Sequence, residues 1–272
     1  MSAAAAQASA DAQLQTPDAE PPAFAGALFW VAVAFSAFQI VTAAFSPLSS
    51  SVVRGVHVGF LLLVTFVLYP PARQRWLGWG IGAAGFATGI YQWVFEADLV
   101  QRAGELTRSD MVIGVVVIAL VFEAARRIMG WALPLVCGTF LAYAVLGQYL
   151  PGVLAHRGYG LDQIVGQLSF GTEGIYGTPT YVSSSYIFLF ILFGAFLERA
   201  GMIQLFTDFA LGLFGHTKGG PAKVAVVSSG LMGTINGSGV ANVVTTGQFT
   251  IPLMKRFGYT PAFAGAVEAT SS

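Results

Sequence analysis

The stretch GTINGSGVANVVTTG, residues 233–247, is the most informative part of the sequence because it interrupts an otherwise apolar segment of the chain. Two apolar arms flank its centre, residues 222–235 and residues 240–254. Each arm has about 14 residues and would form roughly 21 Å of helix at 1.5 Å per residue. An arm of that length covers only part of the roughly 30 Å of hydrocarbon in a bilayer.

Basic residues flank the outer ends of both arms, and they are Lys218, Lys223, Lys255 and Arg256. Lys and Arg close to membrane segments are retained on the cytoplasmic side, so both outer ends are expected on one face of the membrane. A single continuous span would place the two pairs on opposite faces. The pattern therefore predicts a re-entrant helical hairpin over about residues 222–254, with its tip near residues 236–239.

The predicted tip has a definite chemistry. Backbone groups freed by a break in a helix are costly in lipid, so the tip must be buried in protein or line a wet cavity. Neutral side-chain oxygens come from Thr234, Asn236, Ser238, Asn242, Thr245 and Thr246. Carbonyls at the end of the first arm suit a cation, and N–H groups at the start of the second suit a carboxylate. The alternative is close helix packing, because Gly233 and Gly237 form a GxxxG pair.

Composition places the chain in a membrane. The 272 residues are 55% hydrophobic and 10% charged, far from the average of soluble domains. Six apolar blocks are almost free of charge, namely residues 27–45, 56–69, 76–95, 111–122, 131–149 and 181–197. Several approach the roughly 20 residues that a spanning helix needs. We predict an all-α integral membrane protein, a multi-span helical bundle with one re-entrant hairpin. The net charge of zero gives no reason to expect a nucleic-acid partner.

The spans can be oriented by their charges. An N-terminus in the cytoplasm places the acidic loop of residues 96–110 outside, and the arginines expected inside are Arg73, Arg75, Arg126, Arg127 and Arg199. Residues 1–24 are predicted to be a disordered tail, residues 25–150 a first membrane module, and residues 151–272 a second module that begins with an outward-facing connector and contains the hairpin. Within the second module, residues 202–214 are short for a span and suit a helix along the interface.

Ionisable residues in apolar surroundings can mark proton paths. Glu123 precedes Arg126 and Arg127 by three and four residues, so we expect a helical ion pair instead. Glu173 and Glu268 lie among small residues near the boundaries of the second module. These two remain candidates for a functional role.

Catalysis is not expected. An intramembrane protease needs a serine with a basic partner, or two facing aspartates. The histidines, at 57, 156 and 216, lie outside the predicted apolar cores, and His57 is expected to be a satisfied histidine at the membrane interface. The single cysteine, Cys137, cannot form an internal disulfide and is expected to be a small buried hydrophobe. A channel filter would need a repeated carbonyl ladder, which the motif does not offer.

Several stretches resemble the large membrane subunit of TRAP transporters, the tripartite ATP-independent periplasmic carriers. They are GTEGIYGTP (171–179), YIFLFILFGAFLERAG (186–201), GGPAKVAVVSSGLMGTINGSGVANVVTTGQFTIPLMKRFGY (219–259) and FAGAVEA (263–269). The stretches VFEAARRIMGWALPLV (121–136) and YLPGVLAHRGY (149–159) look like the connector of chains in which small and large subunits are fused.

The resemblance implies an elevator-type secondary carrier in the bacterial inner membrane. Residues 25–150 would form its static scaffold with the fusion connector, and residues 151–272 would begin its transport region. The carrier would import organic acids, such as C4-dicarboxylates, delivered by an extracytoplasmic binding protein of the TAXI type. A Na⁺ or H⁺ gradient would drive it, with no cofactor beyond the coupling ion. The family's large subunit continues into a second, inverted repeat, so the chain would hold the first half of the carrier. The alternative is a non-transporting scaffold or assembly fragment.

The resemblance also implies where ion and substrate bind. The contacts would fall on Asn236, Ser238 and Asn242 at the hairpin tip, where Gly237 and Gly239 allow close approach. A Na⁺ ion would lie at Asn236 and Ser238. The nearby polar residues would be Ser228, Ser229, Thr245 and Thr246.

Overall fold

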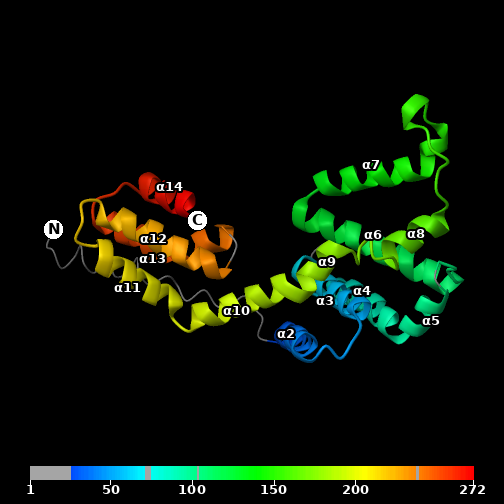
Figure 1. The fold of residues 1–272 in the computed structure, drawn as a ribbon, viewed down its shortest axis with the longest axis horizontal. Helices are drawn as coiled ribbons and strands as arrows, with labels where there is room; N and C mark the ends of the chain where they lie inside the picture. The colour runs from blue at the N-terminus through cyan, green and yellow to red at the C-terminus, as the bar shows by residue number, and fades with distance from the viewer. Residues whose placement is uncertain (1–25, 71–74, 103, 237–238) are drawn as a thin grey trace. The chain divides into compact units, whose positions relative to one another are not determined.

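The computed structural model describes residues 26–70, 75–102, 104–236 and 239–272, and every regular element within these ranges is a helix (Figure 1). The chain divides into two compact units, one ending at Tyr181 and the other beginning at Val182. Four helices in the described ranges are long and apolar enough to cross a membrane, namely Ala27–Phe45, Ser50–Leu68, Ala132–Tyr149 and Thr178–Leu197. The prediction of an all-helical membrane protein is confirmed.

Two of the six predicted spans are not among these four. They form α4 (Arg75–Val94) and α6 (Arg108–Met129), which are long enough to span a bilayer. Glycine and polar residues lower the hydropathy of α4, and α6 carries charged residues near both ends. Length alone therefore does not make either helix an apolar span.

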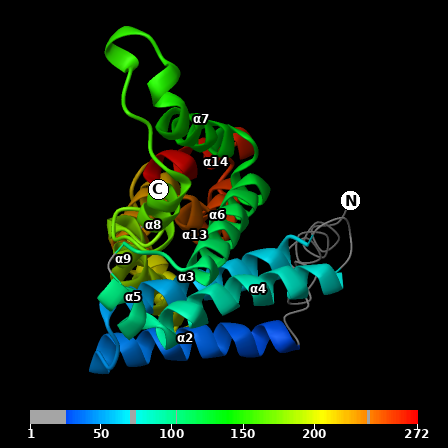
Figure 2. The same cartoon turned by 90° about the vertical axis from the view of Figure 1, so that its right-hand side faces the viewer.

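The first unit contains most of the helices. They are α2 (Ala27–Phe45), α3 (Ser50–Leu68), α4, α5 (Glu96–Arg102), α6, α7 (Ala132–Leu146), α8 (Leu161–Ser169) and α9 (Thr178–Val182), with short turns η2 (Gly147–Tyr149) and η3 (Gly152–Leu154). Figure 2 shows α2, α3 and α4 side by side. Phe60 on α3 joins them, because its ring centroid lies 4.8 Å from that of Phe35 and 4.7 Å from that of Phe86.

Glycines let α4 pack directly against α3. A β-carbon on Gly89 would lie 2.5 Å from the carbonyl oxygen of Gly55, and one on Gly78 would lie 2.5 Å from that of Phe66. Gly82 and Gly85 continue the same stripe between them. Small residues at this spacing allow the close backbone approach typical of membrane helices.

Helix α3 begins earlier than the predicted span. Ser49 caps it by accepting a hydrogen bond from the backbone N–H of Val52 at 3.2 Å. His57 therefore lies within the helix, buried, with its Nδ1 atom 3.0 Å from Nε2 of Gln39. The histidine has a hydrogen-bond partner, as expected, and its place at the membrane interface stays a prediction. Cys137 on α7 is exposed within the chain, so the prediction of a buried hydrophobe was wrong.

Two charged clusters fix the ends of α6. Asp110 in its first turn accepts hydrogen bonds from Thr107 and from the Tyr91 hydroxyl at 2.6 Å, and pairs with Arg102 at 3.1 Å. At the other end, Glu123 pairs with both Arg126 and Arg127 at 2.7 Å, which confirms the predicted ion pair.

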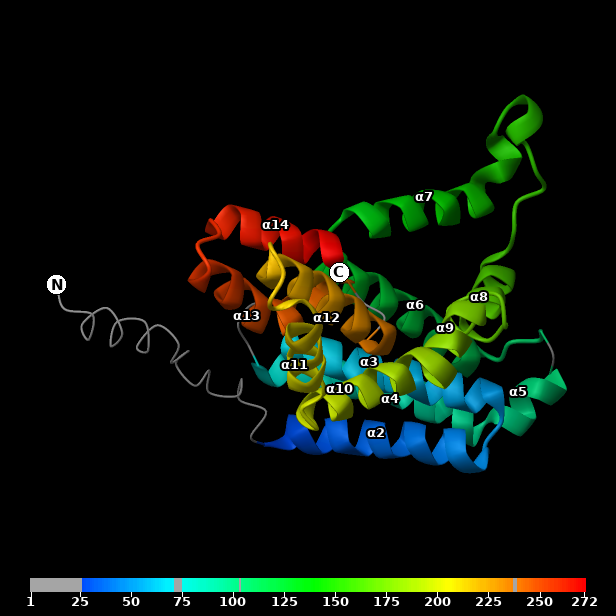
Figure 3. The same cartoon turned by 60° about the vertical axis from the view of Figure 1, so that its left-hand side comes forward.

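The second unit contains the predicted hairpin. Its elements are the π-helical turn η4 (Ser183–Ile187), α10 (Phe188–Arg199), α11 (Met202–Phe214), α12 (Gly220–Asn236), α13 (Gly239–Arg256) and α14 (Pro261–Ser271). Figure 3 shows α12, α13 and α14 side by side. Ala225, Met254 and Ala264, one from each of these three helices, form a buried apolar cluster. The segment of residues 202–214 is a helix, as predicted, and its Asp208 is exposed.

Candidate functional site

The two arms of the hairpin are α12 and α13, which run antiparallel. Ser229 contacts Asn242 near the tip, and Ala225 packs with Met254 further from it. The arms have 17 and 18 residues, more than predicted. At 1.5 Å per residue each is roughly 26 Å long. Helix α12 ends at Asn236 and α13 begins at Gly239, and the basic residues of both arms lie at the opposite, open end.

The side chain of Asn242 ties the arms together. Its Nδ2 atom donates to the carbonyl oxygen and to the hydroxyl oxygen of Ser229, each at 2.9 Å. Asn242 and Ser229 are both buried, so these bonds are made away from water. The Ser229 hydroxyl also lies 2.9 Å from that of Ser272. Gly233 adjoins this contact, because a β-carbon there would lie 3.6 Å from the Asn242 amide nitrogen.

A second buried contact joins α13 to α14. The carboxyl group of Glu268 is fully buried, and its two oxygens meet the hydroxyls of Thr246 and Thr250. Thr246 and Thr250 are one helical turn apart on α13, so both hydroxyls face the same neighbour. Each hydroxyl also lies within hydrogen-bond distance of the carbonyl oxygen four residues earlier.

Ser228 faces a different helix from its neighbour Ser229. Its hydroxyl lies 3.0 Å from that of Thr207 on α11. The buried polar groups therefore link α12 to α11 on one side and to α13 on the other.

The structure brings together part of the predicted site. Asn242, Thr246 and Ser229 lie in one connected network, whereas the Ser228 hydroxyl contacts α11. Gly237 and Ser238 lie outside the described residues. Asn236 ends α12, Gly239 begins α13 and Thr245 lies within α13, and only these helix positions are described for Asn236 and Thr245. The site on these residues stays a prediction.

Two members of the network were not among the predicted site residues. Thr250 repeats the Thr246 position one turn later, a spacing of four that the sequence shows directly. Glu268 was one of two candidate acids, Glu173 and Glu268, and the two differ in how much of each side chain is buried. Glu173 is exposed in the first unit, and Glu268 has no exposed surface in the second.

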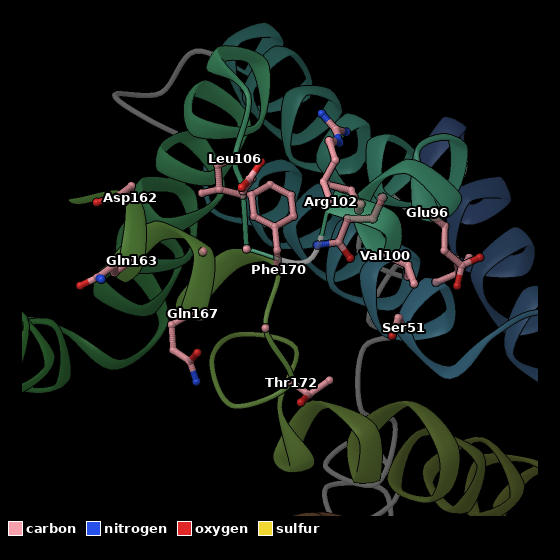
Figure 4. A pocket seen from close by; sticks show the side chains of 17 residues that line it. Ser51, Glu96, Val100, Arg102, Leu106, Asp162, Gln163, Gln167, Phe170 and Thr172 are labelled. Carbon is pink, nitrogen blue, oxygen red and sulfur yellow. The ribbon is translucent and has the colours of Figure 1, made fainter. Parts of the chain in front are cut away.

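A separate cavity of about 610 Å³ lies in the first unit, between α5, α8 and the loops beside them. Figure 4 shows Phe170 between Gln163 of α8 and Arg102 of α5. The cavity wall is polar in part, with Glu96 on the α5 side. No residue predicted to bind ion or substrate lines this cavity.

Comparison with known proteins supports a transporter family. The family model for the DctM component of the tripartite ATP-independent periplasmic transporter matches residues 116–272, more than half of the chain. The matched region begins within α6 and includes the whole hairpin. No solved structure matches the chain.

Similar proteins include three large permease proteins. The C4-dicarboxylate TRAP transporter large permease protein DctM of Pseudomonas aeruginosa is 37% identical over 78 residues, 29% of this chain and 18% of that protein. The protein of the same name from Rhodobacter capsulatus is 34% identical over 82 residues, 30% and 19% of the two chains. A putative TRAP transporter large permease protein of Haemophilus influenzae is 34% identical over 70 residues, 26% and 16% of the two chains.

The chain matches less than a fifth of the length of these relatives. The family match covers a much larger share of the chain itself, and it contains the antiparallel arms and their buried polar contacts. The chain belongs to the family of the DctM component of tripartite ATP-independent periplasmic transporters.

Proposed function

We propose that the chain is part of the membrane permease of a TRAP-type secondary carrier in the bacterial inner membrane. The observation that carries this proposal is the family match over residues 116–272. The proposed substrates are organic acids, either C4-dicarboxylates or related carboxylates, because two similar relatives are named C4-dicarboxylate permeases. An extracytoplasmic binding protein of the TAXI type delivers them, and a Na⁺ or H⁺ gradient drives their import.

The chemistry of the hairpin supports a carboxylate substrate. Helix α13 begins at Gly239, and the first N–H groups of a helix attract anions. The end of α12 at Asn236 offers carbonyl groups, which suit a cation. We place the coupling Na⁺, if Na⁺ is used, at Asn236 and Ser238.

Uptake into liposomes tests this function. The full-length permease is reconstituted with its binding protein, and accumulation of radiolabelled succinate is followed under an imposed Na⁺ gradient or pH gradient. We expect one gradient to drive accumulation, and an ionophore that dissipates it to abolish the effect. Liposomes without the binding protein are the matched control. If neither gradient stimulates uptake although the complex assembles, the carrier function is wrong and a scaffold role takes its place.

The membrane arrangement of the hairpin has a separate test. Cysteines placed at Lys218 and Lys255, with Cys137 replaced by Ser, are labelled from one side of sealed vesicles. Both positions lie at the open end of the hairpin, so we expect both to react from the same side. Labelling from opposite sides rules out the re-entrant arrangement.

A further inference from the structure

The carboxyl group of Glu268 lies in an unusual position for an acid. Glu268 is on α14, has no exposed surface, and is enclosed by α12 and α13. Its oxygens meet two neutral hydroxyls, those of Thr246 and Thr250. Buried acids in membrane proteins are rare because an unpaired charge is costly away from water, and they often mark ion or proton pathways.

No cation neutralises this carboxyl group within the part of the chain that the structure describes. The charged residues of α12 and α13 are Lys223, Lys255 and Arg256, and all three are exposed. Tyr259, in the turn before α14, stacks on Phe263. Glu268 is the only ionisable side chain on α14 itself. The described side chains that contact the carboxyl group therefore supply hydroxyl groups and no positive charge.

The threonine hydroxyls can serve both protonation forms. A protonated carboxyl group has one O–H, which can donate to one threonine oxygen while that threonine donates to its backbone carbonyl oxygen, that of Asn242 at 2.8 Å for Thr246 or that of Thr246 at 3.0 Å for Thr250. The other threonine then donates to the remaining carboxyl oxygen. When the carboxyl group is ionised, both hydroxyls can turn and donate to it instead. Neither form leaves Glu268 without hydrogen bonds. A site that exchanges a proton needs this property.

Threonine hydroxyls occupy the positions directly beside the two carboxyl oxygens. Both carboxyl oxygens lie at direct hydrogen-bond distance from these hydroxyls, so no ion separates the two groups. Gly247 allows this close approach, because a β-carbon there would lie 3.3 Å from Cγ of Glu268. The helices are therefore closed around the carboxyl group.

The carboxyl group also connects to the hairpin. Thr246 contacts both Glu268 and the backbone of Asn242, and the Asn242 amide reaches Ser229 on the opposite arm. A change in the charge of Glu268 can therefore alter the contact between Asn242 and Ser229, which joins the two arms. Glu173, by contrast, is exposed in the first unit.

We propose that Glu268 is a proton-binding site of the permease, which loads and releases the coupling proton through its contacts with Thr246 and Thr250. The proposal rests on the proposed carrier function and selects H⁺ as a coupling ion. On loading, one carboxylate oxygen forms an O–H bond, and on release the same bond breaks and the proton returns to water. The site thus alternates between a negative and a neutral form.

Infrared spectroscopy tests the site without any transport. The purified chain is reconstituted in lipid, and spectra at low and high pH are subtracted to reveal carboxyl groups that exchange a proton. We expect a C=O band of a buried protonated carboxyl group in the wild type and its loss in Glu268→Gln. Asp208→Asn is the matched control, because Asp208 is an exposed acid in the same unit. It should keep the buried band. A spectrum of Glu268→Gln identical to that of the wild type overturns the proposal.

A second variant covers the case in which Glu268→Gln does not fold. Thr250→Val keeps the carboxyl group and removes one of its two hydroxyl partners. We expect the C=O band to move to higher frequency, because a weaker hydrogen bond leaves the carbonyl stiffer. A folded Thr250→Val protein with an unmoved band contradicts the proposed contact and with it the site.

Transport then separates the role of Glu268 from the carrier function. The full-length permease with its binding protein is tested for succinate accumulation under a pH gradient and for succinate exchange without a gradient. We expect Glu268→Gln to lose accumulation and to keep exchange, since exchange needs no net proton movement. Retained proton-driven accumulation in Glu268→Gln overturns the proposal. Failure of both assays in the wild type instead counts against the carrier function, and the infrared result still decides the site.

Discussion

The side-chain amide of Asn242 on α13 donates to the carbonyl oxygen and to the hydroxyl of Ser229 on α12, each at 2.9 Å. Both residues are buried, so the two arms of the hairpin share one dry polar contact. A polar group buried without its partner costs more than the bond itself contributes, which makes this contact a sensitive point of the fold.

Replacing Asn242 is expected to loosen the hairpin. Asn242→Ala removes both bonds and leaves the Ser229 hydroxyl with a smaller set of partners, so we expect a loss of about 1–3 kcal/mol in the free energy of unfolding. Thermal unfolding followed by circular dichroism in detergent measures it. Thr234→Ala is the control, because that exposed hydroxyl bonds only within its own helix. Equal shifts in both variants would show that the contact between the arms is not the cause.

The glycine stripe between α3 and α4 predicts that the stability lost on replacing a glycine of α4 with valine depends strongly on which glycine is replaced. Gly89→Val places a side chain against the carbonyl oxygen of Gly55, and overpacking of this kind costs about 1–3 kcal/mol. Gly80 lies on the same helix with nothing within 4 Å of its β-carbon position. Gly80→Val should therefore unfold close to the wild-type temperature. The prediction fails if the two variants unfold at the same temperature.

Arg126 and Arg127, neighbours on α6, are expected to differ in how much each contributes to the free energy of unfolding. The side chain of Arg127 is 11% exposed, donates to the carbonyl oxygen of Tyr69 and lies over the Phe66 ring, whereas that of Arg126 is 35% exposed. Lys cannot reproduce the planar fork of Arg, so Arg127→Lys should cost about 1 kcal/mol. Arg126→Lys should cost less, because exposed pairs contribute little. Chemical unfolding of both variants measures the two losses in the free energy of unfolding. A larger loss in Arg126→Lys than in Arg127→Lys would contradict the prediction.

The lowered pKa of the Asp110 carboxyl group predicts that the stability of the fold depends on pH. Burial alone raises the pKa of Asp110, but hydrogen bonds from Tyr91 and Thr107, with the charge of Arg102, outweigh it and hold the pKa below its usual value of 3.8. A carboxyl group whose pKa is lowered by folding stabilises the fold at every pH above its usual pKa. That contribution is lost as the pH falls from the usual pKa to the lowered one. The unfolding temperature of the wild type should therefore exceed that of Asp110→Asn at pH 6.

The difference between these two proteins should shrink as the pH falls below 3.8 towards the lowered pKa of Asp110. Glu105→Gln is the control, since Glu105 is exposed in the same loop region. A difference that does not change with pH would mean that the charge of Asp110 does not stabilise α6.

Much of the fold could be predicted because it depends on local patterns. Hydropathy located α2 at its observed bounds, and the spacing of Glu123 from Arg126 and Arg127 specified their ion pair. The length of α3 was underestimated because its first turn is polar and a serine cap extends it. The contact of the α4 glycines with α3 was not predicted, because it depends on which helices pack together.

For the candidate site, charge and hydropathy act locally along the chain, so they are enough to predict two helical arms that flank a polar, glycine-rich stretch and carry basic residues at their open end. The bond from Asn242 to Ser229, and the burial of Glu268 rather than Glu173, follow from how the helices pack. The burial of a side chain depends on which helices pack around it. That packing joins residues 13 to 22 positions apart in the sequence, and no local pattern specifies it.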